Sequence, residues 1–555
     1  MNTFTLLIFL FPLFFVIVII KKILFWLYLW QLKEYHPGRL LNHFSTAKGR
    51  ELLLNKVNLL KIFFLFIIIY SYLLPDDPPA DSWLGSFILS LLSLFFIYTA
   101  EGLKALKDFF QKTLKKPIFT KKIILLFSII VIAAAIFFYS ALQRLDLLSI
   151  LIFDLLIPLI VSAVILLFQP LAVLARNQII GKAKRKREKF RDLLVIGITG
   201  SYGKTSTKEF LATILSEKYN VLKTKEHQNS EVGISQCIIN DLKPEHQIFV
   251  CEMGAYNRGG IKLLCDIVKP KIGILTGINE QHMATYGSLE NIIRTKFELI
   301  KALPEDGLAI LNDSDPKIKN EKLKIKNYNL KLKNIKFYSV DDKKDVWAED
   351  INIEKEFISF KAVAKDGDYA DFKVNLLGKQ NILNILGVAA VAKELGMNLK
   401  EISAACEKIE PEQSGFQLKK GIGGLNVIDA TYSANPDGVI SHLEYLKTFP
   451  GKKVIVMPCL IELGKASKEV HKRIGRKIGE VCDLTIITTK DRFQEIVEGA
   501  RFRQCFGGRE IKILFLENPK EIFEKIKNFT KEGDVVLLES RVPELLIKQL
   551  LNETI

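Results

Sequence analysis

Long apolar segments fill the first 173 residues of this 555-residue chain, and they constrain its fold more than any other feature. A helix needs roughly 20 mostly apolar residues to cross a bilayer. Five segments come close to or exceed that length, and the first is interrupted by Lys21 and Lys22. They cover residues 4–31, 57–75, 83–100, 122–141 and 147–173. We therefore expect residues 1–175 to form an all-α transmembrane bundle of about five helices.

The charges between these segments predict how the bundle is oriented. Residues 33–56 hold five Lys or Arg and residues 101–122 hold seven Lys, whereas residues 76–82 hold three Asp and no base. Cytoplasmic loops carry the excess of Lys and Arg, so the N-terminus is expected outside and the chain beyond 175 in the cytoplasm. The sequence thus predicts a multi-pass protein of the cell (inner) membrane, with the lipid bilayer as a partner.

The basic charge is concentrated in this apolar half. Residues 1–192 hold 24 Lys and Arg against 11 Asp and Glu, a net charge of +13, and the whole chain carries +17, which leaves +4 for the other 363 residues. The dense basic segment 176–192 favours a juxtamembrane linker on anionic lipid over a nucleic-acid patch, and no nucleic-acid partner is expected.

Asp154, inside the fifth segment, is either functional or simply solvated near the end of its span. The seven cysteines form no CxxC pair, so neither a disulfide framework nor a zinc site is predicted.

A glycine-rich turn follows the basic segment, in the stretch VIGITGSYGKTSTKEF from Val195 to Phe210. An apolar strand precedes the turn and a helix follows it, which is the context of a loop that binds nucleotide phosphates. Glycines let backbone N–H groups converge, and the helix N-terminus adds its dipole. The alternative is a plain glycine turn that binds nothing. Lys204 would neutralise the β/γ-phosphates of ATP and Thr205 would hold Mg²⁺, within a binding loop made of Thr199, Gly200, Ser201, Tyr202, Gly203, Lys204, Thr205 and Ser206.

The loop TGSYGKTSTKEF resembles the ATP loop of the Mur ligases, which has the form TGxxGK[ST]. The resemblance extends over about 193–545 and is strongest to the member that adds D-alanyl-D-alanine to a muramoyl-tripeptide. It implies an ATP-binding α/β central domain over 193–408 and a Rossmann-like α/β C-terminal domain over 409–555. The family's own N-terminal domain is absent, and the membrane segment takes its place.

Two further segments carry the catalytic residues that this resemblance implies. IFVCEMG ends an apolar strand in Glu252, and the family's matching Glu holds Mg²⁺. IGILTGINEQHMATYGSLENIIRTKFELI contains His282 and Lys296 at the family's spacing. His282 would ligate a second Mg²⁺, and Lys296 would react with CO₂ to give a carbamate. A carbamate replaces an ammonium with an anionic oxygen ligand of the kind that Mg²⁺ needs.

Three residues are expected on the nucleoside side of ATP. ILNDSDP resembles the family motif Asn-x-Asp-Asp, so Asn312 and Asp315 would approach the adenine, although a plain turn is the alternative. VIDATYSANPDG resembles IDDxYNANPxS, so Asp429 would hold the ribose.

The sequence departs from the family pattern at several positions. Gln380 replaces a histidine, although Asn381 and Asn384 are kept, as either functional or structural residues. The family's γ-phosphate arginine aligns with Gly415 or Phe416, and its C-terminal lysine is missing, with Arg541 as a candidate substitute.

The implied activity is an ATP-dependent amide ligase. It would join an amino acid or dipeptide to the carboxylate of a muramoyl-peptide cell-wall precursor through an acyl phosphate. A non-catalytic ATP-binding scaffold, which would organise other envelope-synthesis membrane proteins, is the alternative that the missing arginine and lysine favour. An ATP-driven transporter is disfavoured because the chain has no ABC-type signature segment.

Overall fold

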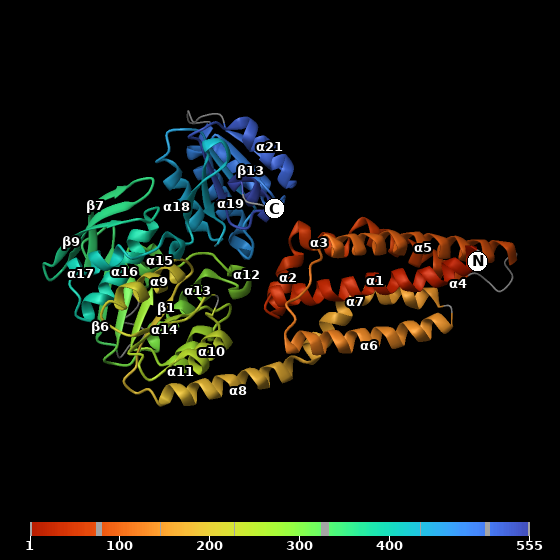
Figure 1. Cartoon of the computed structure of the whole chain (residues 1–555), viewed down its shortest axis with the longest axis horizontal. Helices are drawn as coiled ribbons and strands as arrows, with labels where there is room; N and C mark the ends of the chain where they lie inside the picture. Colours follow the sequence, from red (N-terminus) through yellow and green to blue (C-terminus); the bar gives the residue numbers. More distant parts are fainter. Residues whose placement is uncertain are drawn as a thin grey trace. The chain divides into compact units, whose positions relative to one another are not determined.

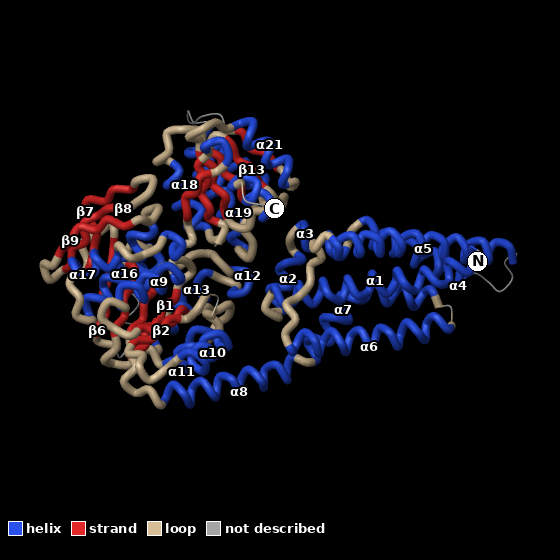
Figure 2. Tube along the Cα trace, in the orientation of Figure 1, coloured by secondary structure: helices blue, strands red, loops and turns tan. Residues whose placement is uncertain are grey.

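The computed structural model divides the chain into two compact units, Met1–Ala175 and Arg176–Ile555 (Figure 1). It describes residues 3–73, 80–144, 146–226, 228–322, 332–432, 434–504 and 511–552. The first unit is helical, and the strands lie in the second (Figure 2). The fold class expected from the sequence, a helical N-terminal region followed by mixed α/β domains, is confirmed.

The first unit is built from seven helices and the start of an eighth. They are α1 (Thr3–Leu32), α2 (Pro37–Phe44), α3 (Ala47–Leu53), α4 (Lys56–Leu73), α5 (Ala80–Phe110), α6 (Lys121–Gln143), α7 (Leu147–Leu167) and α8 (Gln169–Glu188). Among the described residues, four stretches are long and apolar enough to cross a membrane: Leu10–Leu32, Ala47–Tyr70, Lys121–Gln143 and Leu147–Leu167. The expected span at 83–100 lies within α5, where side chains are described only from residue 92 onward, and part of the acidic loop 76–82 falls outside the described residues.

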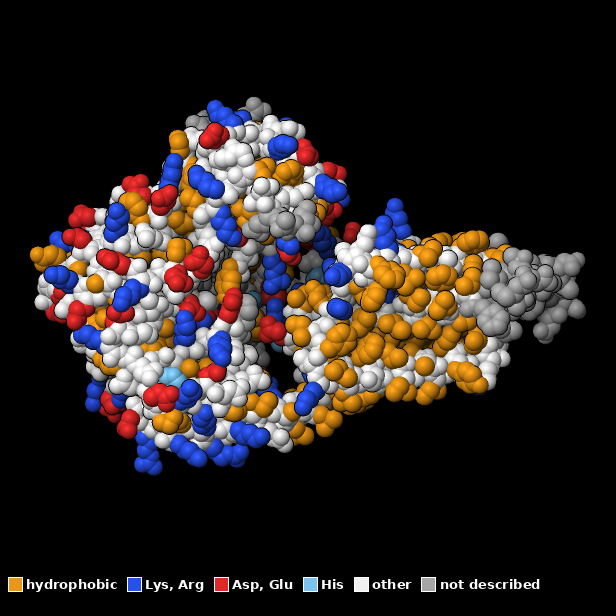
Figure 3. All heavy atoms as spheres, viewed as in Figure 1, with side chains coloured by type: hydrophobic (Ala, Val, Ile, Leu, Met, Phe, Trp, Pro, Cys, Tyr) orange, Lys and Arg blue, Asp and Glu red, His pale blue; other side chains and the backbone are white. Residues whose placement is uncertain are grey.

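Apolar side chains point outward as well as inward in this unit. Phe66 of α4, Ile136 of α6 and Leu159 of α7 are each 66% exposed. Figure 3 shows hydrophobic side chains spread over the face of the bundle that it presents. A soluble protein buries most such residues, so this surface fits a lipid environment. Inside the bundle, Trp30 of α1 donates a hydrogen bond from Nε1 to Ser162 Oγ of α7 at 2.9 Å.

The first sheet of the second unit has nine strands in the order β2-β3-β1-β4-β5-β6-β7-β8-β9. Strands from β2 to β7 along this order are parallel, and β7, β8 and β9 are antiparallel. Their bounds are β1 (Leu194–Thr199), β2 (Val221–Lys223), β3 (Ile248–Glu252), β4 (Ile272–Leu275), β5 (Leu308–Asn312), β6 (Asn334–Ser339), β7 (Val346–Ile353), β8 (Ile358–Ala364) and β9 (Tyr369–Val374).

Helices cover both faces of this sheet, which explains why its central strands are apolar along their whole length. Ile196 and Ile198 of β1 pack under one set of helices, whereas Val195 packs under the other. The first set is α9 (Lys204–Leu215), α16 (Gln380–Glu394) and α17 (Leu399–Cys406). The second set is α10 (Glu231–Asp241), α11 (Gly260–Val268), α13 (Leu289–Lys296) and α14 (Glu298–Lys301). Two short helices, α12 (Met283–Tyr286) and α15 (Pro316–Lys322), follow β4 and β5 respectively.

The second sheet has six strands in the order β10-β11-β15-β12-β13-β14, parallel except for β10. They are β10 (Gln417–Lys420), β11 (Asn426–Ala430), β12 (Lys453–Met457), β13 (Leu484–Ile487), β14 (Lys512–Phe515) and β15 (Val535–Glu539). Its helices are α18 (Pro436–Leu446), α19 (Ser467–Val481), α20 (Phe493–Gln504), α21 (Pro519–Phe529) and α22 (Glu544–Leu551). Functional loops of such parallel sheets lie at the carboxyl ends of the strands, and the expected site residues Thr199, Glu252 and Asn312 are the last residues of β1, β3 and β5.

Candidate active site

The glycine-rich loop joins the end of β1 to the start of α9, as the sequence predicts. Gly203 caps the helix with a φ of +76°, and a Cβ there would lie 2.6 Å from Asn384 Oδ1. A Cβ on Gly200 would lie 2.1 Å from Thr276 Oγ1. Both positions therefore require glycine, because neighbouring elements leave no room for a side chain.

The loop presents a helix N-terminus that no side chain among the described residues caps. The first N–H groups of a helix lack intrahelical acceptors, and an anion satisfies them. Lys204, the first residue of α9, has its Nζ 3.4 Å from the carbonyl oxygen of Ser201. Burial lowers the pKa of Lys204, and the nearby Glu252 carboxylate partly opposes that effect. This cradle of uncapped amides and one cation fits the phosphates of ATP.

Other residues of the loop hold it in shape. Thr199 donates from Oγ1 to the Met253 carbonyl at 3.0 Å, and the Ser201 N–H donates to the Gly277 carbonyl at 2.7 Å. Tyr202 donates its hydroxyl to Asp315 Oδ2 at 3.0 Å. Their described contacts are thus within the protein and fix the loop against β3 and β4.

Glu252 ends β3 directly beside this loop, because the β1–β3 register pairs it with Ile198. It is 5% exposed, and its Oε1 accepts a hydrogen bond from Asn229 Nδ2 at 3.0 Å. Its Oε2 lies 3.7 Å from Nζ of Lys208, a fully buried lysine of α9. The carboxylate is therefore held in place with the loop and α9 as neighbours, where a Mg²⁺ bound to phosphates and to the Thr205 hydroxyl would need it.

Lys296, the last residue of α13, is a buried lysine with an unusual environment. It is 4% exposed, and no carboxylate among the described residues lies within ion-pair distance. Burial, with a further contribution from the positive charge of Lys204, lowers the pKa of Lys296 to about 7, although Glu298 and Glu252 act in the opposite direction. A large fraction of this amine is uncharged near neutral pH, and an uncharged amine is a nucleophile.

His282 lies at the start of α12 with a φ of +63°, and its Nδ1 is 2.6 Å from Oε2 of Glu462 in the C-terminal α/β domain. Its ring packs edge-on against Tyr256 at 4.8 Å. Burial lowers the pKa of His282, the Glu462 carboxylate opposes this, and Lys296 and Lys204 lower it further. A neutral imidazole whose Nδ1 is engaged leaves Nε2 as the only ring nitrogen able to ligate a metal.

The described carboxylates do not by themselves supply enough ligands for a metal ion. Among the described residues there is no group of three His, Cys, Asp or Glu side chains that could hold a metal ion. Mg²⁺ takes oxygen ligands, and the site has Glu252 and the Thr205 hydroxyl, with His282 nearby. The residues fit Mg²⁺ best if phosphate oxygens and a further anionic oxygen complete the set.

Asn312 and Asp315 lie behind the loop and are fully engaged by the protein. Asn312 donates from Nδ2 to the Thr276 carbonyl at 2.7 Å, and Asp315 accepts from the Ile278 N–H at 2.8 Å and from Tyr202. These bonds join β5 to β4 and to the phosphate loop. Their described contacts therefore support the floor of the site, and their approach to adenine is still a prediction.

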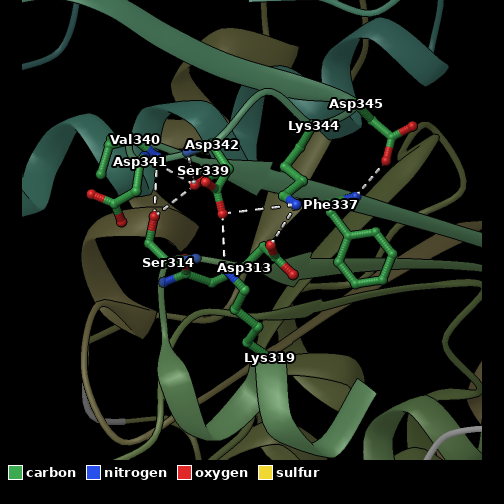
Figure 4. A network of polar contacts seen from close by, with 11 residues as sticks. Asp313, Ser314, Lys319, Phe337, Ser339, Val340, Asp341, Asp342, Lys344 and Asp345 are labelled. Atoms are coloured by element: carbon green, nitrogen blue, oxygen red, sulfur yellow. Dashed lines mark hydrogen bonds and ion pairs between the residues drawn. The ribbon is translucent and has the colours of Figure 1, made fainter. Parts of the chain in front are cut away.

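Ser314 stands where the family motif has its first Asp, and its contacts explain how the segment is held without that carboxylate. Its Oγ lies 3.0 Å from Ser339 Oγ and accepts a hydrogen bond from the Val340 N–H at 3.0 Å (Figure 4). Next to it, Asp313 pairs with Lys344 at 2.9 Å. This network ties the segment to the connection between β6 and β7.

Asp429 is the next-to-last residue of β11 in the second sheet, and its described contacts are all within the C-terminal domain. It accepts from Thr431 Oγ1 at 2.7 Å and from Lys419 Nζ at 3.1 Å. The structure thus groups the loop, Glu252, His282 and Lys296 by their mutual electrostatic effects, and it shows no such coupling for Asp429. A ribose contact at Asp429 is still a prediction.

The two departures from the family pattern come together in space. Gly415 has a φ of +65°, and Phe416 is buried and stacks on His442 with ring centroids 4.1 Å apart. His442 Nδ1 lies 2.7 Å from Oε2 of Glu539, a buried residue at the end of β15. An aromatic–imidazole–carboxylate cluster therefore lies where the expected arginine and lysine are missing, and Arg541 is exposed beside it.

Further polar residues complete the site, among them the Asn381 and Asn384 pair that the sequence left as either functional or structural. Asn384 Oδ1 accepts from Thr207 Oγ1 of α9 at 3.3 Å, and its Nδ2 donates to Asn381 Oδ1 at 3.1 Å, so this Asn pair supports the loop. The C-terminal domain also reaches the central domain directly through Asn279–Asn435, at 3.0 Å, and Glu280–Arg473, at 3.2 Å. The only sequence signal for these contact residues would be their position within segments that resemble family motifs.

Comparison with known proteins identifies two domains. Residues 198–392 match the Mur ligase middle domain, and residues 416–541 match the Mur ligase glutamate ligase domain. The UDP-N-acetylmuramoyl-tripeptide--D-alanyl-D-alanine ligase of Bacillus subtilis is 27% identical over 349 residues, covering 62% of this chain and 72% of that protein. The ligase of the same name from Escherichia coli is 28% identical, covering 51% of this chain and 61% of its own.

Solved structures give the same relationship. MurF from Acinetobacter baumannii matches with a TM-score of 0.61 and 25% identity, over 68% of this chain and 80% of that one. MurF ligase from Thermotoga maritima in complex with ADP matches with a TM-score of 0.57 and 28% identity, over 68% of this chain and 84% of that one. The chain spans between about three fifths and three quarters of the two curated relatives described above.

Proposed function

This chain carries the middle and C-terminal domains of the Mur ligases, a family of ATP-dependent acid–amino acid ligases, and we propose that it is a membrane-anchored amide ligase of cell-wall synthesis. It joins an amino acid or dipeptide, D-alanyl-D-alanine by its relatives' names, to the carboxylate of a muramoyl-peptide precursor. The observation that carries the proposal is Lys296, a buried lysine at the end of α13 that has no carboxylate within ion-pair distance among the described residues and that interacts with Lys204 of the phosphate loop.

The reaction proceeds in two steps. An oxygen of the acceptor carboxylate attacks the γ-phosphorus of ATP, ADP leaves, and an acyl phosphate forms. The amine nitrogen of the second substrate then attacks the acyl carbon, and phosphate leaves with a proton lost from nitrogen to give the amide. Lys204 and the uncapped amides of α9 bind the phosphates and stabilise charge on the transferring group.

Lys296 fits the role of an anionic ligand after modification. Its uncharged amine can add to CO₂, losing a proton, so that a carbamate oxygen replaces an ammonium beside Glu252. Mg²⁺ held by Thr205, Glu252 and the modified Lys296, with His282 at a second position, would neutralise phosphate charge. Glu462 orients His282 from the other domain, so this ligand is in place only when the two domains are together.

The scaffold alternative is favoured by one observation. Gly415 and Phe416 supply no cation, and Glu539 brings a negative charge into the same cluster. A scaffold would bind ATP without turning it over. A catalytic ligase would have to work without the arginine and the lysine that are missing here.

The test is ADP formation by the full-length protein in detergent with Mg²⁺, bicarbonate and D-alanyl-D-alanine. UDP-linked and lipid-linked muramoyl-tripeptides are supplied in separate reactions. Lys296→Ala is compared with Arg294→Ala, which removes an exposed residue of the same helix. We expect ADP formation that needs acceptor and amine, that Arg294→Ala keeps and that Lys296→Ala loses. ATP binding without turnover for either acceptor would contradict the ligase and favour the scaffold.

A further inference from the structure

The helical unit contains a pocket of about 670 Å³ that the ligase reaction does not use. It is lined from α1, α3, α4, α5 and α7 and from the segments that follow α3 and α5. Its volume lies within the ~300–1,000 Å³ of small-molecule sites. The lining holds five lysines and four carboxylates, which is an exceptional density of charge for a bundle whose helices are long and apolar enough to cross a membrane.

The inner end of the pocket is a cluster of charged residues from four helices, α1, α4, α5 and α7. Asp154 of α7 is fully buried, and its two oxygens accept from Nζ of Lys22 at 2.6 Å and from Nζ of Lys61 at 2.7 Å. Lys61 also pairs with Glu101, and the Tyr98 hydroxyl donates to Asp154 at 3.1 Å. Every carboxylate in this cluster is therefore already paired with a lysine.

The outer part of the pocket has cations to spare. Lys21 pairs with Asp108 at 2.8 Å. Lys56, Lys104 and Lys115 are exposed lining residues without a carboxylate partner among the described residues, and only Glu51 opposes them. The pocket thus has a neutralised interior and a net positive outer part, which is the arrangement that attracts an anion.

The rest of the lining is apolar and continues onto the surface of the bundle. Trp26, Leu155 and Pro158 line the pocket. On α4, which begins at Lys56, Leu59 and Phe63 are 51% and 58% exposed. A hydrocarbon chain attached to an anion in the pocket could lie along such a surface, whereas a free anion would gain nothing from it.

We propose that this pocket binds a lipid whose headgroup is a phosphate or diphosphate. The headgroup contacts Lys56, Lys104 and Lys115, Lys22 is within the same cavity, and the chain lies on the apolar faces of the helices. Basic pockets between membrane helices on the cytoplasmic side bind phosphate headgroups in this way. The inference does not depend on the proposed ligase activity, because it concerns binding by residues 1–175 alone.

The test measures binding of three probes to the full-length protein in neutral detergent micelles. Farnesyl diphosphate carries both the anion and the chain, farnesol carries only the chain, and inorganic pyrophosphate carries only the anion. Lys56→Gln/Lys104→Gln is compared with Lys107→Gln/Lys116→Gln, which removes two exposed lysines that do not line the pocket. Both variants change the net charge equally, and all four side chains are exposed, so neither is expected to disturb folding.

We expect farnesyl diphosphate to bind more tightly than either other probe. The Lys56/Lys104 variant should weaken that binding by about tenfold or more, as expected for loss of charge-assisted contacts, and the control variant should match the unaltered protein. Pyrophosphate binding as tightly as farnesyl diphosphate would overturn the lipid assignment in favour of a free anion. Equal binding by the two variants, or no binding of farnesyl diphosphate, would overturn the site itself.

Discussion

His282 Nδ1 and Glu462 Oε2 lie 2.6 Å apart, although 180 residues separate them in the sequence and they belong to different α/β domains. The backbone of the same loop is also joined across the interface, because the Ala284 N–H donates to the Glu462 carbonyl at 3.0 Å. A carboxylate that accepts from one imidazole nitrogen fixes the tautomer and aims the other nitrogen. The contact couples the position of a proposed metal ligand to closure of the two domains.

Glu462→Gln should raise the Mg²⁺ concentration needed for half-maximal ADP formation by about 10–100-fold, the usual effect of losing such a partner. A Mg²⁺ titration of ligase activity measures it. Glu469→Gln, an exposed change on α19, serves as the control. An unchanged Mg²⁺ requirement in Glu462→Gln would show that Glu462 does not act through His282.

Activation by CO₂ should rise with pH around neutrality. With a pKa of about 7 for Lys296, the uncharged fraction is about one tenth at pH 6 and about nine tenths at pH 8. Preincubation at fixed CO₂ pressure should therefore raise the initial rate of ADP formation more at pH 8 than at pH 6. Lys296→Arg should lose this response. A CO₂ response that is flat between these pH values would contradict carbamate formation at Lys296.

The same lysine should affect stability in a pH-dependent way. The pKa of Lys296 in the folded protein lies below the unfolded value of about 10.4. Burying the ammonium therefore destabilises the fold by its full amount below about pH 7, and this destabilisation shrinks as the pH rises toward 10. Lys296→Met should raise the melting temperature at pH 6 and have a smaller effect at pH 9. Differential scanning calorimetry of the two proteins at both pH values checks this, and an effect of equal size at the two values would refute it.

Gly203→Ala should weaken ATP binding by about tenfold or more. The substitution requires a φ of +76° and puts a methyl group 2.6 Å from Asn384 Oδ1, so the loop must move. Gly259→Ala is a matched control, because Gly259 caps α11 with a φ of +78° but has nothing within 4 Å of its added Cβ. Both changes cost about 1 kcal/mol of backbone strain. Comparable ATP affinity in the two variants would show that the contact with Asn384 is unimportant.

Asp154→Asn should destabilise the helical unit by about 3–5 kcal/mol, because it leaves the fully buried Lys61 and the partly buried Lys22 with one carboxylate fewer. Thermal unfolding of the detergent-solubilised protein measures the loss. Asp146→Asn, at the N-cap of α7, is the control, since asparagine caps a helix as well as aspartate does. Equal melting temperatures for the two variants would mean that the ion cluster contributes little to stability.

Much of the fold could be predicted because its signals are local. The strand, turn and helix around Gly203 follow from hydrophobic pattern and glycine placement within 16 residues, and the structure has them where expected. The long apolar helices follow from segment length and hydropathy. His282 and Lys296 were singled out only through family resemblance, since neither a loop histidine nor a helical lysine carries a signal of its own.

The partners of these residues could not be predicted. The contact of Glu462 with His282 depends on how two domains meet. Asp154 was expected to be either functional or solvated, whereas the structure buries it between Lys22 and Lys61, which lie 132 and 93 residues away. The sequence carries no signal of the bond between Ser314 and Ser339, which lie 25 residues apart, and this bond gives Ser314 a structural role.

The sequence by itself determined the division into an apolar helical part and α/β domains, and the position of the phosphate loop, because periodicity, glycine placement and segment length act over short distances. Only the tertiary structure decided that Lys296 titrates near pH 7, that His282 is held by Glu462, and that lysines from several helices share one pocket. The physical reason is that desolvation and electrostatic coupling depend on which groups surround a side chain, and those groups come from distant parts of the chain.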